Sequence, residues 1–138
     1  MILEVDFSAE EPIYQQIRSQ VVHAVATGEL VAGDALPSVR SLAADLGVNM
    51  HTVNKAYAVL RDEGYVVMRR RTGAVIADRA ETLSPAVRSQ ERERLAEAVY
   101  RLALEHKAQG GSLDEFAAIA DAQAKRAYGD ASPARSGQ

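Results

Sequence analysis

The sequence contains no cysteine and no tryptophan, and only 5% of its 138 residues are aromatic. Without cysteine the chain can form neither disulfide bridges nor thiolate metal sites. With so few aromatic residues, the core has to be built from Leu, Val, Ile and Ala, which the apolar content of 47% allows. A chain of this length fits one domain, or one small domain with an appended segment.

Long apolar runs and familiar catalytic motifs are also absent from the sequence. No run approaches the length of a membrane-spanning helix, and residues 1–12 lack the basic start of a secretion signal. We therefore expect a soluble, cytoplasmic protein without membrane contact. The three histidines, His23, His51 and His106, are scattered, and no metalloprotease, phosphate-loop or serine-hydrolase motif occurs. These absences predict a protein that is not an enzyme and uses no cofactor or metal.

The most informative stretch, residues 36–64, contains two helical patterns separated by a glycine. The first helix is expected over residues 38–46, with Ser38 as its N-cap and Gly47 at its end. The second begins after Asn49, which is a further N-cap residue. The apolar stripe of this second helix consists of Val53, Ala56, Tyr57 and Leu60. A short helix, a tight turn and a longer helix indicate a helix-turn-helix motif.

Polar side chains occupy the start of the second helix, on the side opposite its apolar stripe. Such side chains can form hydrogen bonds with base edges and phosphates when the helix enters a major groove of DNA. The residues predicted to contact DNA in this motif are Ser38, Asn49, His51, Thr52, Asn54, Lys55, Tyr57 and Arg61.

A basic β-hairpin is expected after the second helix. Residues 65–68 and 74–77 are β-type apolar runs, and the tip between them contains three adjacent arginines and a glycine. Arginines at a hairpin tip suit contact with phosphates or a minor groove, although a solvated turn can carry the same charges. The preceding helix-turn-helix favours DNA contact. The residues assigned to it are Arg69, Arg70, Arg71 and Gly73.

The formal net charge of −3 is unevenly distributed along the chain. Residues 49–79 contain six basic and three acidic side chains, a local balance of +3, whereas the rest of the chain is acidic. The field at the contact face, rather than the total charge, steers association with DNA. The acidic total is therefore compatible with double-stranded DNA as a partner.

Several motifs follow one another in an order that resembles a known family. They are PIYQQI at residues 12–17, LPSVRSLA at 36–43, LGVN at 46–49, TVNKAY at 52–57 and LRDEGY at 60–65. Together they resemble the winged-helix domain of GntR-type bacterial transcription regulators, and the YtrA subfamily in particular. Met50, His51 and Arg71 depart from the subfamily pattern. The first two suggest an unusual base preference, and Arg71 replaces a glycine and makes the wing tip more basic.

The resemblance also assigns a role to Arg40, near the start of the first helix of the motif. In the family the matching arginine contacts the DNA backbone, which is expected of Arg40 here. The alternative is a solvated charge that pairs with Asp45.

Helices are expected on both sides of this central segment. One spans residues 12–27, and Ser8 with Glu11 has the spacing of a capping box at its start. After a domain boundary near Ala80, two helices cover residues 85–109 and 112–128. Residues 129–138 have the composition of a disordered tail.

The two C-terminal helices are predicted to pair with a second copy of the chain. Two helices cannot enclose a ligand cavity or bury their apolar side chains alone. The side chains expected in a homodimer interface are Leu95, Val99, Leu102, Leu113, Phe116 and Ile119. The resemblance to the YtrA subfamily implies the same short dimerisation region. The alternative is that both helices fold back on their own winged helix.

These expectations describe a mainly α fold with a small β-wing. A winged helix-turn-helix domain occupies residues 1–80, and a two-helix dimerisation region with its tail occupies residues 81–138. The predicted function is a sequence-specific transcriptional regulator, a repressor that binds an inverted-repeat operator as a homodimer. The alternative is a protein-interaction module that uses the winged helix only as a scaffold. A small-molecule effector, the operator and the regulated genes are left open.

Overall fold

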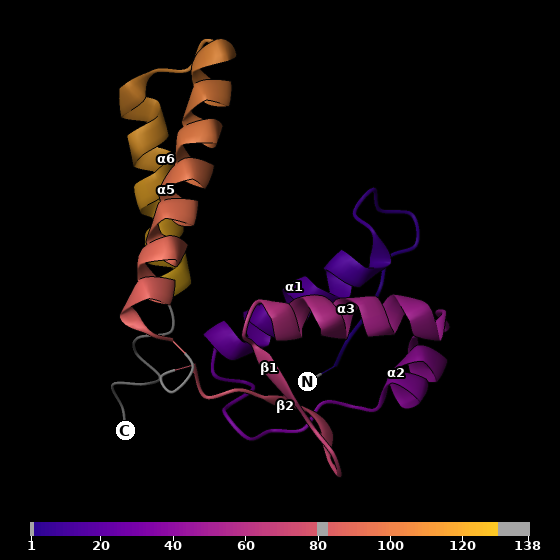
Figure 1. The fold of residues 1–138 in the computed structure, drawn as a ribbon. Helices are drawn as coiled ribbons and strands as arrows, with labels where there is room; N and C mark the ends of the chain where they lie inside the picture. The colour runs from indigo at the N-terminus through magenta and orange to yellow at the C-terminus, as the bar shows by residue number, and fades with distance from the viewer. Residues whose placement is uncertain (1, 80–82, 130–138) are drawn as a thin grey trace. The chain divides into compact units, whose positions relative to one another are not determined.

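The computed structural model describes residues 2–79 and 83–129. Its helices and strands are α1 (Ile13–Ala26), α2 (Val39–Leu46), α3 (Met50–Asp62), β1 (Val66–Arg69), β2 (Gly73–Ile76), α5 (Pro85–Ala108) and α6 (Leu113–Tyr128) (Figure 1). The predicted mainly α fold with a small β-wing is thus confirmed. The chain divides into two compact units, residues 1–83 and 84–138. The predicted boundary near Ala80 and, apart from Gly129, the predicted tail at residues 129–138 fall outside the described residues.

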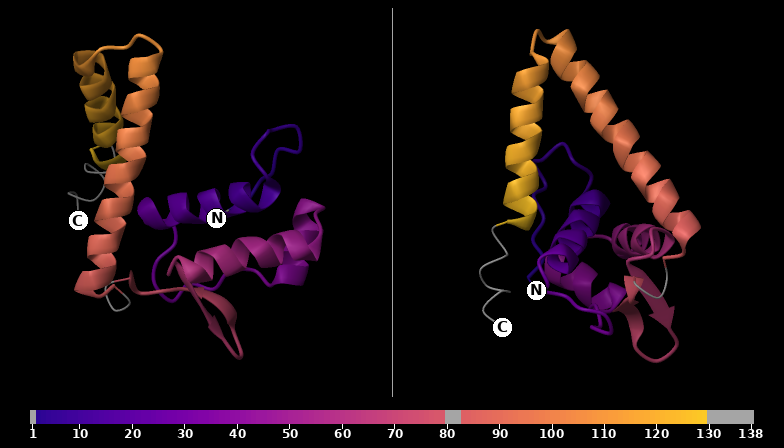
Figure 2. Two further views of the ribbon diagram at one scale, coloured as in Figure 1. Left: turned by 45° about the horizontal axis from the view of Figure 1, so that its top comes forward. Right: turned by 90° about the vertical axis from the view of Figure 1, so that its left-hand side faces the viewer.

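The first unit is organised around one apolar core, which the three helices and the hairpin share. Helix α3 packs against α1, α2 and β1, and further views show it running alongside α1 (Figure 2). The most deeply buried large side chains come from α1, α3 and β1: Ile17, Val21, Val53, Leu60 and Val66. Since aliphatic side chains fill this core, the low aromatic content of the sequence is no obstacle to folding.

The base of the wing is fixed to the rest of the first unit by backbone hydrogen bonds. Strands β1 and β2 are antiparallel, with Val66 opposite Ile76. The loop before α2 pairs with the other edge of β2: the Leu36 amide donates to the Ala74 carbonyl at 2.9 Å, and the Ile76 amide donates to the Asp34 carbonyl at 2.8 Å. The base of the hairpin is therefore anchored, and its tip projects (Figure 1).

The predicted capping box before α1 is wrong. The Ser8 hydroxyl donates to the Asp6 carboxylate at 2.6 Å, and α1 begins after Pro12 with no side-chain cap. A buried side chain further along the helix stabilises this region instead. The side-chain Nε2 of Gln16 donates to the backbone carbonyls of Asp6 and Glu11. Its side-chain Oε1 accepts a hydrogen bond from the backbone amide of Asp6 at 2.8 Å. Gln16 therefore ties the N-terminal arm to the helix.

The second unit is a hairpin of two helices. The Ser112 hydroxyl accepts the Glu115 amide at 3.1 Å, so the predicted N-cap of α6 is confirmed. Gly111 lies in the turn against the His106 ring, which a Cβ atom at this position would overlap. Helices α5 and α6 diverge from the turn (Figure 2), and neither contains a buried residue among those described. Among the described residues, no helix is long and apolar enough to cross a membrane.

Candidate nucleic-acid interface

The turn between α2 and α3 is set by three residues. The Ser38 hydroxyl accepts the Ser41 amide at 3.0 Å, and the Asn49 side chain accepts the His51 amide at 2.7 Å. Between the two helices, Gly47 adopts a left-handed backbone conformation with φ of 70°, which residues other than glycine rarely adopt. These contacts end α2 and start α3 within a few residues. The caps that the sequence predicts are therefore confirmed, and they fix the angle at which α3 leaves the turn.

Helix α3 has two chemically distinct faces. Val53, Ala56 and Leu60 are completely buried against the core. On the other side, His51, Asn54 and Lys55 are exposed and Thr52 is half-buried. The structure thus gathers four of the predicted contact residues on the outer face, near the start of the helix. Their hydrogen-bonding groups can reach a partner surface without disturbing the core.

Further predicted contact residues surround this face. Arg40, on the first turn of α2, is exposed, and no carboxylate of the described residues forms an ion pair with it. The predicted alternative pairing with Asp45 is not formed. Arg61, at the far end of α3, lies 3.2 Å from the Asp62 carboxylate, with both side chains largely exposed. An adjacent carboxylate offsets part of its charge, so Arg61 is a weaker candidate for phosphate contact than Arg40.

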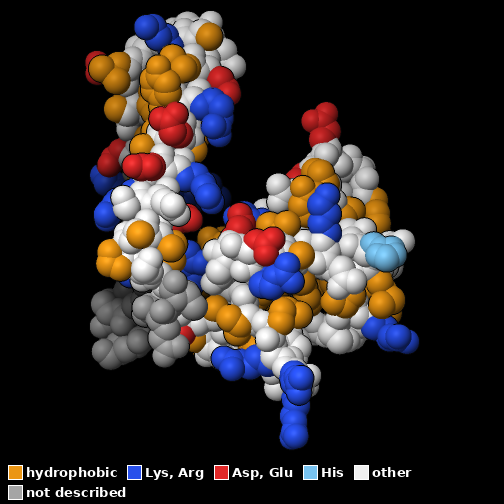
Figure 3. Space-filling view, in the orientation of Figure 1, with side chains coloured by type: hydrophobic (Ala, Val, Ile, Leu, Met, Phe, Trp, Pro, Cys, Tyr) orange, Lys and Arg blue, Asp and Glu red, His pale blue; other side chains and the backbone are white. Residues whose placement is uncertain are grey.

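The wing supplies a second group of cations. Arg69 ends β1, Gly73 begins β2, and Arg70 and Arg71 lie in the turn between them. All three arginines are exposed, and Figure 3 shows basic side chains at the projecting tip of the hairpin. The anchored base and the free tip leave these guanidinium groups able to contact an anionic surface.

Tyr57 is predicted to contact DNA, but its side chain is buried. Its side chain is only 4% exposed, and its hydroxyl donates to the Pro37 carbonyl at 2.7 Å. Burial raises the pKa of Tyr57 to about 12, because the phenolate would lose its hydration. Tyr57 therefore joins α3 to the segment before α2, and we withdraw it from the predicted contact residues. Its position on the apolar stripe was the correct signal.

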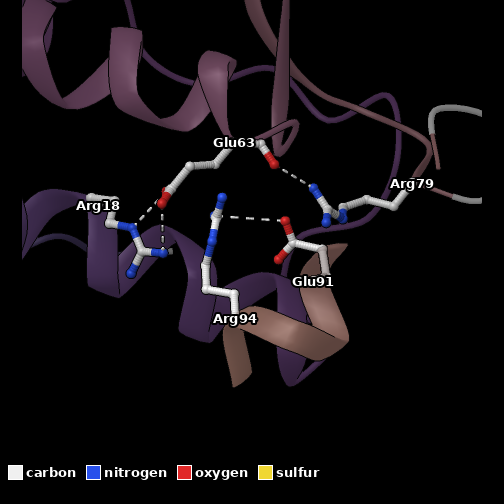
Figure 4. Close-up of polar contacts among 5 residues, drawn as sticks. All are labelled: Arg18, Glu63, Arg79, Glu91 and Arg94. Carbon is white, nitrogen blue, oxygen red and sulfur yellow. Dashed lines mark hydrogen bonds and ion pairs between the residues drawn. The ribbon is translucent and has the colours of Figure 1, made fainter. Parts of the chain in front are cut away.

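Residues that the sequence did not single out fix the C-terminal end of α3 (Figure 4). Arg18 Nε on α1 donates to Glu63 Oε1 at 2.8 Å, and this bond raises the pKa of Arg18. Arg79 Nη1 donates to the Glu63 carbonyl at 2.7 Å, and its Cζ atom lies 4.5 Å from the centroid of the Tyr65 ring. Contacts across 45 and 16 positions leave no periodic signal in a sequence.

The start of α3 has a second neighbour that the sequence did not indicate. Lys55 Nζ lies 4.1 Å from the centroid of the Tyr14 ring, on the first turns of α1. An ammonium at this distance over an aromatic face is held by a cation–π interaction. One of the predicted contact side chains is thus positioned by a residue of another helix.

In the second unit, the side chains predicted to pair two copies are largely exposed. The exposed fractions are 64% for Leu95, 54% for Leu102, 80% for Leu113 and 51% for Ile119. Val99 is also exposed, whereas Phe116 is half-buried and its ring lies 5.9 Å from that of His106. Figure 3 shows apolar side chains on the surface of this hairpin. The two helices do not bury these side chains between themselves.

Among the described residues, no group of three or more His, Asp or Glu side chains could hold a metal ion. The side chains that the described residues offer for binding are the polar and cationic ones on α3 and on the wing.

Known proteins are similar to this chain in sequence and in fold. Residues 13–76 match the family described as bacterial regulatory proteins, gntR family. The structure of YtrA from Sulfolobus acidocaldarius, a GntR-family transcription factor, is 41% identical to this chain, with a TM-score of 0.55. That match covers 72% of this chain and 99% of the other. This chain belongs to the GntR family.

Two further proteins extend the comparison of this GntR chain. The transcriptional repressor YtrA of Bacillus subtilis is 38% identical over 81 residues, which cover 59% of this chain and 62% of that protein. A crystal structure of a transcriptional antiterminator from Listeria monocytogenes EGD-e is 27% identical, covers 92% of both chains and has a TM-score of 0.74. The GntR chain spans 62% of the length of this repressor and of two other curated relatives that it matches.

The buried hydroxyl of Tyr57 predicts a specific loss of stability at high pH. The unfolded chain ionises its tyrosines near pH ~10, whereas folded Tyr57 remains protonated up to about pH 12. The free energy of unfolding should therefore fall by roughly 2 kcal/mol between these pH values. Denaturant titrations of the wild type and Tyr57→Phe across this range should show a smaller fall in the variant. Identical pH profiles would contradict the burial of this hydroxyl.

Proposed function

We propose that this GntR chain is a sequence-specific regulator of transcription that binds double-stranded DNA through the outer face of α3. One observation carries the proposal: the polar side chains at the start of α3 are exposed while the opposite face is completely buried. An α-helix fits the major groove, where base pairs display distinct patterns of donors and acceptors. His51 and Asn54 would contact base edges there, with Thr52 and Lys55 beside them.

Contacts to the DNA backbone would come from three places around α3. Arg40 and Ser38 lie at the start of α2, Asn49 lies in the turn, and the wing carries three arginines. Phosphate contacts fix the register of a protein on the duplex, and base contacts select the sequence. The cations of the wing would thus add affinity, while the outer face of α3 would add specificity.

We further propose that two copies pair through α5 and α6. Leu95, Leu102, Leu113 and Ile119 are each at least half exposed, and burying such a side chain is worth about 1.5–3 kcal/mol. A symmetric dimer would remove them from water and present two copies of α3 to successive half-sites. The operator would then be an inverted repeat.

The proposal that this chain represses transcription, and does not activate it, rests on similarity alone. The related YtrA of Bacillus subtilis is a repressor, and we propose repression here as well. A protein-interaction module with a winged-helix scaffold is the alternative. The two functions are separated by selecting binding sites from a pool of random duplexes, because only a DNA reader enriches a defined sequence.

Replacing base-contacting residues should change sequence preference. We expect His51→Ala or Asn54→Ala to cost ~1–3 kcal/mol in operator binding and to relax preference at one base pair. Affinities for single-base-pair variants of the selected site measure this change. His23→Ala, which removes another exposed histidine, should leave the preference unaltered. If neither α3 variant altered it, the assignment of bases to α3 would be wrong.

The wing should contribute affinity that depends on salt and not on sequence. Affinity falls as salt rises, and we expect each single replacement of Arg69, Arg70 or Arg71 by Ala to make this dependence weaker. The slope of log affinity against log salt should become less negative by about one unit, because one phosphate contact is lost. Binding isotherms at several salt concentrations give the slope. Arg126→Ala, which removes an exposed arginine from α6, is the matched control. Equal slopes for wild type and wing variants would exclude backbone contact by the wing.

The exposed apolar side chains of α5 and α6 should make the intact chain dimeric. We expect sedimentation to show a dimer, and Leu102→Glu to yield a folded monomer with weak operator binding, because a buried carboxylate would be costly. Val31→Glu is the control, since Val31 is as exposed as Leu102 but belongs to the first unit. Deletion of residues 85–138 should have the effect of Leu102→Glu. A wild-type monomer that binds a half-site tightly would contradict this pairing.

A further inference from the structure

A groove lies where the first turns of α1 and α3 meet, beside the residues proposed to contact bases. Its volume is about 650 Å³. The residues that line it are Pro12, Ile13, Tyr14, His51, Thr52 and Lys55. Half of them are candidate DNA contacts, and the other half are the N-cap and the first two residues of α1, to which no contact was assigned. This part of the proposed interface therefore depends on two helices.

Within this groove the Lys55 ammonium lies over the Tyr14 ring. Lys55 is exposed, and the distance from its Nζ atom to the ring centroid is 4.1 Å. Tyr14 is half-buried and packs against the hydrophobic core, which limits the positions that its side chain can adopt. A lysine side chain has four rotatable bonds and loses considerable entropy when it is fixed. The ring restricts that freedom before any partner binds.

The partner of the Lys55 ammonium determines how much of its positive charge remains available to bind an anion. No carboxylate of the described residues forms an ion pair with Lys55. A carboxylate would neutralise the ammonium, as Asp62 partly does for Arg61. An aromatic face attracts the ammonium through its quadrupole and leaves the positive charge and N–H donors for an anion. Tyr14 therefore fixes the ammonium without neutralising it.

We infer that Tyr14 is a positioning residue for DNA binding, whose ring holds Lys55 toward a backbone phosphate next to the bases contacted by α3. The inference rests on the proposed function, because it requires that α3 enters a DNA groove. It extends the interface to α1 through the Tyr14 ring. Since a phosphate is present at every step of the duplex, Tyr14 should affect affinity for all sequences alike.

The test combines two replacements of Tyr14 with one of Lys55. Tyr14→Leu removes the ring and should weaken binding to the selected operator about two- to fivefold, the range of an exposed cation–π contact. Binding to an unrelated duplex should weaken by the same factor, and preference among single-base variants should stay the same. Tyr14→Phe keeps the aromatic ring and should bind both duplexes with the affinity of the wild type. In a Lys55→Gln background, Tyr14→Leu should have no further effect.

A readout without DNA reports the contact itself. Ring currents should shift the ε-methylene protons of Lys55 upfield in the free wild-type chain and in Tyr14→Phe, but not in Tyr14→Leu. Urea unfolding of each variant shows whether it is folded at the concentrations used for binding. A loss of affinity in a folded variant then reflects the interface rather than stability.

Three results would overturn the inference while leaving the proposed function intact. The first is an equal loss from Tyr14→Leu with and without Lys55, which would mean that the ring acts through the fold. The second is a loss in Tyr14→Phe as large as in Tyr14→Leu, which would assign the effect to the hydroxyl. The third is unchanged affinity in Tyr14→Leu. A wild-type chain that binds no duplex would instead overturn the proposed function together with this inference.

Discussion

The burial of one face of α3 is the constraint on which the rest of the first unit depends. Val53, Ala56 and Leu60 have no contact with solvent, and Ile17 and Val21 of α1 are equally buried. A rotation of α3 about its axis would expose these side chains, at a cost of about 1.5–3 kcal/mol for each large one. The core thereby determines which residues of α3 point outward. The surface proposed to contact DNA is the consequence of apolar packing on the opposite side.

Polar contacts then refine the position that the core determines. Capping by Asn49 fixes the start of α3, and the contacts of Glu63 with Arg18 and Arg79 fix its end. The second unit shows the opposite condition, since α5 and α6 contain no buried residue among those described and expose several large apolar side chains. The first unit has a buried apolar core of its own, whereas no described residue of α5 or α6 is buried. This difference is why we propose recognition for the first unit and pairing for the second.

Local patterns in the sequence predicted the features that depend on local physics. The turn at Gly47, the caps at Ser38, Asn49 and Ser112, and the basic hairpin are each encoded by residues that lie close together in the sequence. Side-chain contacts between distant segments were not predictable in this way. Tyr57 was assigned to DNA although its place on the apolar stripe indicated burial, and the Tyr14–Lys55 contact has no periodic signature. The Ser8 cap failed because Asp6 binds that hydroxyl instead.

The central claim is that the outer face of α3 determines sequence preference while the buried face only holds the helix. Its most direct test is to replace His51, Thr52 and Asn54 by the residues of a GntR-family relative that differs from this chain at all three positions, and to select sites from random duplexes with both parents and the hybrid. The account predicts that the hybrid selects the bases of that relative at the positions that α3 contacts and unfolds at the same urea concentration as the wild type. A stable hybrid that still selected the parental sequence would contradict it.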